Sequence, residues 1–174
     1  MELRTLRKRC EARLRQLDLP MPFDVQSFGE RLAARRGRPI LLYPARSEAG
    51  PFGLWVAGPS LDVVFYEEET SPLHQDHIIL HELCHLLCDH QPVPLSDTEL
   101  ARLLCPDLDP STVQRVLHRA SYSTDEEREA ELLASLIVRQ TAGGPPHPHT
   151  QPLDTETVDV LHRLEASLER DGSP

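Results

Sequence analysis

The sequence predicts a single α+β domain: a small antiparallel sheet packed on one central helix, with additional helices around it. Two amphipathic segments come first, three short strand-like runs follow between residues 39 and 66, and a long apolar segment comes next. Helical periodicity and short runs bounded by glycine, proline and serine distinguish these two kinds of element. A chain of 174 residues can bury one sizeable core, and it contains no internal repeat.

We expect this domain to occupy residues 1–142, with basic N-terminal helices within residues 1–38. Residues 143–152 are rich in proline, glycine and histidine and cannot continue a helix, so they read as a linker. Residues 153–174 would then form a C-terminal helix and tail.

The first elements follow from local patterns. A basic amphipathic helix is predicted over residues 3–17, and a second over residues 25–36, ending before a glycine. Turn signals between the strand-like runs favour an antiparallel meander. The predicted strands are residues 39–43, 53–57 and 62–66.

The next helix carries the most informative motif in the chain. Ser71 and Pro72 suit the N-cap and first position of a helix that runs to about His90. Residues 81–85 read His-Glu-Leu-Cys-His. Residues four apart lie on one helical face, so His81 and His85 can offer their imidazoles to one metal ion.

Glu82 and the apolar surroundings strengthen the metal interpretation. A glutamate directly after the first histidine can act as a general base on a metal-bound water. The helix is apolar nearly all round, which places the histidines in a buried position where they need polar partners. The alternative is that these histidines are ordinary core or surface residues of an amphipathic helix.

A later acidic helix offers the third ligand. Thr124 is its predicted N-cap, with Glu127 closing a capping box. Glu127 and Glu131 share a stripe with small alanines where another helix can approach closely, so we expect Glu127 to bind the metal and Glu131 to accept a hydrogen bond from a ligand histidine. Glu129 points away and is expected to take no part. Acidic first-turn residues are also ordinary partners of the helix dipole.

Residues 81–87 and 127–134 together resemble two motifs of the ImmA/IrrE family of metallo-endopeptidases. The second motif of that family usually reads Glu-x-Glu-Ala-Asn/Asp-x-Phe-Ala. Residues 61–66 resemble the strand before its active-site helix, so the likeness covers roughly residues 20–140. Two positions depart from the pattern, because Cys84 stands where glycine is usual and Glu131 replaces Asn or Asp.

The resemblance implies a zincin-like fold of the gluzincin type, with zinc, or manganese, bound by His81, His85 and Glu127. It further implies a peptidase in which Glu82 deprotonates a metal-bound water, and which cleaves a helix-turn-helix (XRE-type) repressor encoded nearby. We expect the substrate to pair with the strand near residues 63–66. The alternative is a metal-containing regulatory module that inhibits the repressor by contact alone. A purely structural metal site is disfavoured, because two histidines and one glutamate leave a coordination position open.

Further residues are candidates for supporting roles. His77 lies on the face of the motif histidines and is a candidate to orient one of them, whereas His74 is expected to be satisfied locally or exposed. Tyr122 and His118 are candidate donors to an oxyanion, although either can equally be a packing residue. Two short helices are predicted between the motifs, at residues 97–104 and 111–120.

Charge and cysteine content exclude other classes. The formal net charge of −10 disfavours nonspecific binding to nucleic acid. The basic N-terminal helices are either a docking surface for an acidic partner or a solvated face.

No apolar stretch is long enough to span a membrane and no signal peptide is recognisable, so we expect a cytoplasmic protein. The four cysteines show no zinc-knuckle spacing and are expected to be reduced.

Overall fold

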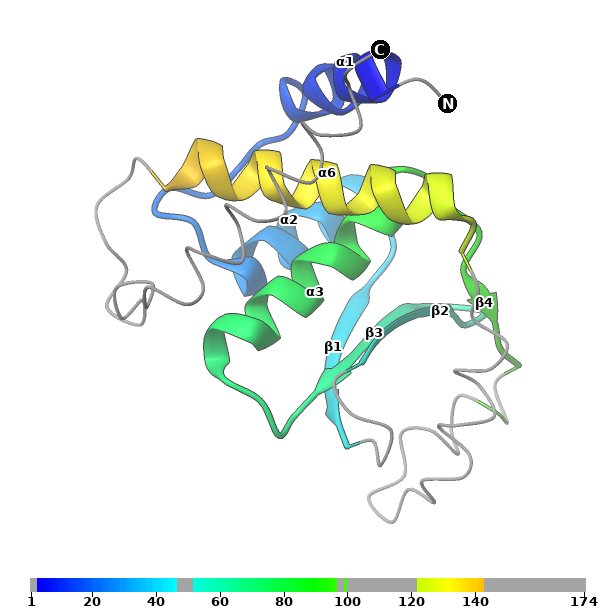
Figure 1. Cartoon of the computed structure of the whole chain (residues 1–174). Helices are drawn as coiled ribbons and strands as arrows, with labels where there is room; N and C mark the ends of the chain where they lie inside the picture. Colours follow the sequence, from blue (N-terminus) through cyan, green and yellow to red (C-terminus); the bar gives the residue numbers. More distant parts are fainter. Residues whose placement is uncertain (1–2, 47–51, 97–98, 100–121, 143–174) are drawn as a thin grey trace. The chain divides into compact units, whose positions relative to one another are not determined.

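The computed structural model describes residues 3–46, 52–96, 99 and 122–142 (Figure 1). All of them belong to one compact unit, Met1–Gly144. The predicted helix at residues 97–104 lies outside the described residues except for Glu99. The predicted helix at 111–120, the linker at 143–152, the C-terminal helix from residue 153 and His118 lie outside them completely.

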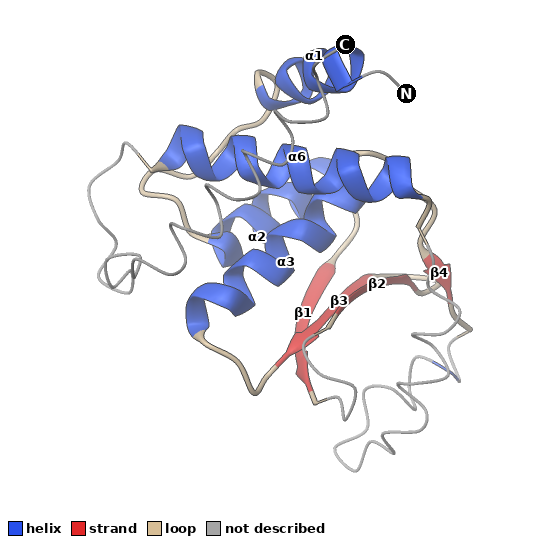
Figure 2. Cartoon of the chain, in the orientation of Figure 1, coloured by secondary structure: helices blue, strands red, loops and turns tan. Residues whose placement is uncertain are grey.

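The described residues form an α+β fold with four helices and a four-stranded sheet, as the sequence predicts (Figure 2). The motif helix begins after the predicted N-cap Ser71. The second helix ends at the predicted place, where Gly37 adopts a left-handed φ of 63°. The elements are α1 (Leu3–Leu14), α2 (Val25–Arg36), β1 (Ile40–Ala45), β2 (Gly53–Ala57), β3 (Asp62–Glu67), α3 (Pro72–Leu87), β4 (Val93–Pro94) and α6 (Thr124–Thr141).

The sheet is mixed, so the predicted antiparallel meander is wrong. Its strand order is β1-β3-β2-β4, with β1 parallel to β3, β3 antiparallel to β2, and β2 parallel to β4. The strand β3 lies in the interior of the sheet, and its Val63, Val64 and Phe65 are buried. A continuous apolar run of this kind is typical of a strand covered on both faces, which is the feature that distinguishes β3 from an edge strand.

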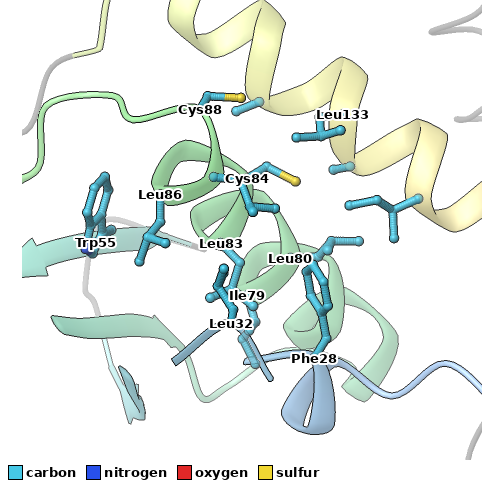
Figure 3. Packing of buried hydrophobic residues seen from close by; sticks show 14 of the residues in the cluster. Phe28, Leu32, Trp55, Ile79, Leu80, Leu83, Cys84, Leu86, Cys88 and Leu133 are labelled. Carbon is cyan, nitrogen blue, oxygen red and sulfur yellow. The ribbon is translucent and has the colours of Figure 1, made fainter. Parts of the chain in front are cut away.

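The helix α3 lies at the centre of the fold. It packs against β2 and β3 on one side and against α6 on another, while α1 covers α6 (Figure 1). Figure 3 shows Cys84 and Cys88 on the side of α3 that faces Leu133 of α6, and Phe28 and Leu32 of α2 at another side of the same core. Because α3 and α6 pack against each other, side chains of the two helices that face each other lie close together.

The N-terminus of α6 lies one residue earlier than predicted. Ser123, and not Thr124, is the N-cap, and Glu126, and not Glu127, completes the capping box. The Ser123 amide and hydroxyl both donate to Oε2 of Glu126 at 2.8 Å. This shift of one residue leaves the carboxylate of Glu127 available for a different contact.

No described helix has the length and apolar composition needed to cross a membrane.

Candidate metal centre

Three side chains predicted to bind metal come together where α3 meets α6. The Nε2 atoms of His81 and His85 are 3.0 Å apart, and Oε2 of Glu127 lies 3.3 Å from the first and 3.7 Å from the second. Ligand atoms at about 2.0–2.1 Å from a tetrahedral zinc ion are separated by about 3.3 Å. The three distances lie within about 0.4 Å of this value, so the spacing of the donor atoms is compatible with such an ion.

The helix α3 presents the histidines in different environments. The side chain of His85 is fully buried and that of His81 is 20 % exposed. Burial, together with His81 and His90, lowers the pKa of His85 to about 3. His85 is therefore neutral at physiological pH, which is the form of imidazole that binds a metal ion.

The helix α6 supplies the carboxylates because small residues let it approach α3 closely. Ala130 and Ala134 are completely buried between the helices. Glu127 and Glu131 flank them on the same stripe, as predicted, and both carboxylates reach His81. The carboxylate of Glu127 is 48 % exposed, so the ligand cluster opens to solvent on this side.

Glu131 lies beside His81, where the sequence places it, whereas the ion-pair partner of His77 is Glu131 and not a motif histidine. Oε2 of Glu131 lies 3.3 Å from Nδ1 of His81 and 3.8 Å from Nε2 of His77. The hydrogen bond with His81 lowers the pKa of Glu131, so its carboxylate is charged. A charged carboxylate at Nδ1 of His81 holds the proton there and leaves Nε2 free to bind a metal ion. His74 is satisfied locally, since its Nδ1 is 2.9 Å from the hydroxyl of Thr70.

Glu82 lies on the sheet side of α3, close to the edge of β2. It is only 5 % exposed, and its Oε2 accepts a hydrogen bond from the backbone N–H of Trp55 at 3.0 Å. Burial is the main reason that the pKa of Glu82 rises to about 7. A carboxyl group with this pKa exchanges its proton near neutral pH, which suits a general base.

Gly53 makes room for this carboxyl group. A Cβ atom at position 53 would lie 2.5 Å from Oε1 of Glu82 and 2.8 Å from Cγ2 of Ile78. These separations are too short for non-bonded atoms, so any side chain there would force Glu82 or the backbone of β2 to move. The position therefore requires glycine for space.

We expect Gly53→Ala to lower the free energy of unfolding by about 1–3 kcal/mol. Gly29→Ala is the matched control, because a Cβ atom there meets only ordinary contacts at 3.7 and 3.8 Å. Gly29 lies inside α2, where alanine should raise stability by up to about 1 kcal/mol. Urea denaturation of the metal-free variants measures both effects, and equal stability of the two variants would contradict the steric role of Gly53.

Tyr122 lies against the ligand cluster. Its ring stacks on that of His85, with centroids 3.6 Å apart and an interplanar angle of 19°. The phenolic oxygen is buried and has no hydrogen-bond partner among the described residues. Burial, with Glu82 and Glu127 nearby, raises the pKa of Tyr122, so the hydroxyl keeps its proton and remains a donor.

Sequence reasoning missed His90 as a part of this site. His90 is 7 % exposed, and its Nδ1 lies 2.8 Å from Nδ1 of His85. Together with Cys88 and Glu129, it forms a second buried group whose donor atoms lie within 4.8 Å of one another. The one sequence signal was the end of α3 itself, since a residue just beyond a helix terminus can fold back over the last turn.

The cysteines described by the structure are free and buried, as expected for Cys84 and Cys88. Burial is the largest cause that raises the pKa of Cys84 well above its usual value and that of Cys88 to about 12. These thiols remain protonated at neutral pH and are poor nucleophiles.

The fold and the site define an α+β domain with a candidate metal centre of two histidines and one glutamate. No protein-family model matches this chain, and no curated protein or solved structure matches it. The likeness to the ImmA/IrrE family therefore continues to depend on the motifs at residues 81–87 and 127–134.

Proposed function

We propose that this protein is a zinc-dependent endopeptidase with a zincin-like fold, related to the ImmA/IrrE metallopeptidases. The observation that carries the proposal is the triangle of donor atoms from His81, His85 and Glu127, with the buried carboxyl group of Glu82 on the same helix. Two imidazoles and one carboxylate suit zinc better than manganese, which prefers sites dominated by oxygen. Three protein ligands also leave the open position that a catalytic zinc site needs.

The residues around the centre have complementary tasks in peptide hydrolysis. A bound zinc ion supplies a Lewis acid that polarises the peptide carbonyl and lowers the pKa of water. Glu82 takes the proton from the attacking water and later passes it to the leaving amine. In this proposal Tyr122, whose ring stacks on His85 and whose hydroxyl has no partner among the described residues, donates a hydrogen bond to the oxyanion that develops on the carbonyl.

The strand that would hold the substrate is β2, and not β3 as expected from the sequence. Both sides of β3 are already paired, with β1 and with β2. In the described part of the chain, β4 covers only Val56 and Ala57 of β2. The segment Gly53–Trp55 runs beside Glu82, which already accepts from the N–H of Trp55. An extended peptide added there would pair with the remaining backbone groups of this segment and pass the catalytic base.

A helix-turn-helix repressor remains the proposed substrate. DNA-binding proteins are basic over the surface that contacts phosphate. In this chain, residues 39–174 contain 23 acidic and 8 basic residues, so most of the protein can attract such a surface. Charge complementarity of this kind favours association with the repressor and disfavours association with DNA.

The experiment that tests the proposal combines the purified chain with the helix-turn-helix repressor that the proposal expects to be encoded nearby. We expect zinc-dependent conversion of the repressor to shorter fragments, detected by mass spectrometry. Treatment with a chelator should stop cleavage, and added zinc should restore it. A repressor that stays intact but loses DNA binding would replace the peptidase by a module that inhibits through contact alone.

A further inference from the structure

A buried chain of polar contacts runs from the candidate metal centre to the N-terminal helix. Nδ1 of His85 lies 2.8 Å from Nδ1 of His90, and Nε2 of His90 lies 3.5 Å from Oε2 of Glu129. Glu129 in turn contacts Arg9 at 3.0 Å and Arg13 at 3.8 Å, both on α1. The histidines and Glu129 are all less than 9 % exposed.

The end of α3 is built to bring His90 into this position. Asp89 adopts a positive φ of 56°, which reverses the chain direction directly after the helix. The amide of His90 then donates to the carbonyl of His85 at 3.1 Å. Arg13 donates to the carbonyl of Leu87 at 2.6 Å, so α1 also fixes this turn.

The positions of the protons follow from the proposed metal site. A neutral histidine carries one ring proton. If Nε2 of His85 binds the metal, the proton of His85 is on Nδ1 and is donated to Nδ1 of His90. The proton of His90 is then on Nε2, where it faces the carboxylate of Glu129. The contact between His85 and His90 then has one donor and one acceptor. Nε2 of His90 forms no hydrogen bond among the described residues, but it lies 3.5 Å from the carboxylate of Glu129, which is the acceptor nearest to its proton.

We propose that His90 and Glu129 are positioning residues that orient His85 for metal binding, with Arg9 and Arg13 balancing the charge of Glu129. This inference rests on the proposed metal site. A ligand histidine whose second nitrogen has a fixed acceptor keeps the required tautomer and ring orientation. Glu131 contacts Nδ1 of His81 in the same way, so each histidine ligand has its own acceptor.

A second metal ion bound by Cys88, His90 and Glu129 is the competing explanation of the same cluster. It would use Nε2 of His90 as a ligand, which moves the proton of His90 to Nδ1. Two protonated Nδ1 atoms would then face each other at 2.8 Å whenever His85 also binds its metal. The two arginines beside Glu129 further disfavour a cation there. The geometry therefore supports one ion.

The inference gives Glu129 a role that the sequence did not suggest. Its helical position points away from Glu127, and we expected it to be irrelevant to the metal. In the structure Glu129 is 3 % exposed and lies on a different face of α6 from Glu127. There its carboxylate contacts His90, which follows the end of α3. The basic helix α1 contacts the rest of the fold through Arg9, which donates to Glu129, and through Arg13, which donates to the carbonyl of Leu87.

The first test measures the zinc dissociation constant of full-length variants by competition with a chelator. We expect His90→Leu to weaken zinc binding by about 10–100-fold. His90→Asn should retain most of the affinity, because its amide oxygen can take the place of Nδ1 as the acceptor. Glu129→Gln, which keeps an acceptor without the charge, should lose less affinity than His90→Leu. Cys88→Ala is the matched control and should bind zinc like the parent.

The second test uses the unaltered chain, so it does not depend on the folding of a variant. In nitrogen-detected NMR of the zinc-loaded protein, His85 should be protonated at Nδ1, and His90 at Nε2 only. Two zinc ions per chain, loss of affinity in Cys88→Ala, or a His90 protonated at Nδ1 would overturn the inference and leave the proposed function intact. A parent chain that binds no zinc would overturn both.

Discussion

Glu82→Gln is expected to leave zinc binding and repressor binding in place while cleavage falls by a factor of about 10² or more. Glutamine has nearly the same size and shape as glutamate but cannot take a proton from water. Zinc is bound by His81, His85 and Glu127 in our proposal, so the ion should remain. The measurement is the rate of repressor cleavage, together with the zinc content of the purified variant.

The local structure predicts that this variant folds normally. The backbone N–H of Trp55 donates to Oε2 of Glu82, and the amide oxygen of glutamine can accept the same hydrogen bond. Burial opposes the charged form of Glu82. A neutral amide at this position avoids that desolvation cost, so the free energy of unfolding should not decrease.

Glu67→Gln is the matched control, because Glu67 is also a buried glutamate, at the end of β3. It should cleave the repressor at the rate of the parent chain. If Glu82→Gln cleaves as fast as the parent chain, Glu82 is not the base. If Glu82→Gln still inactivates the repressor in cells, inhibition by contact takes the place of proteolysis.

The parts of the structure that follow local rules were predictable from sequence. Ser71 with Pro72 marks the start of α3, and Gly37 marks the end of α2, because capping depends on a few neighbouring residues. Histidines at i and i+4 must share a helical face. The convergence of His81 and His85 therefore required no knowledge of the tertiary fold.

The order of the strands depends on non-local contacts, and here local rules failed. The turn signals between β2 and β3 correctly indicated an antiparallel pair. Nothing in them states that β1 lies on the far side of β3 and runs parallel to it. The clue available in the sequence was the unbroken apolar run Val63-Val64-Phe65, since a strand with both faces covered belongs in the interior of a sheet.

The contact between His90 and Glu129 was missed for a related reason. The two residues are far apart in sequence, and the fold brings them together only because Asp89 reverses the chain after α3. A helical wheel for α6 correctly places Glu129 on a different face from Glu127. It does not show that a residue from another element reaches around to that face.

Glu127→Ala is expected to abolish tight zinc binding, because it removes a direct ligand and leaves only His81 and His85. Glu131→Ala should retain zinc with about 10–100-fold lower affinity, because Glu131 contacts Nδ1 of His81 on the side away from the ion. A chelator-competition titration measures both dissociation constants. Normal binding by Glu127→Ala with loss of binding by Glu131→Ala would move the ligand one helical turn along α6.

Glu126→Ala gives the sharpest control, since Glu126 and Glu127 are neighbours with separate roles in the structure. The carboxylate of Glu126 accepts from the amide and hydroxyl of Ser123, whereas that of Glu127 faces the histidines. Loss of the capping box should lower the free energy of unfolding by about 0.3–1.5 kcal/mol and leave zinc affinity unchanged. Glu127→Ala should show the opposite pattern, because its carboxylate is half exposed and makes little contribution to the stability of the metal-free fold. If Glu126→Ala lost zinc while Glu127→Ala bound it normally, Glu126 would be the metal ligand. Glu127 would then close the capping box, as expected from the sequence.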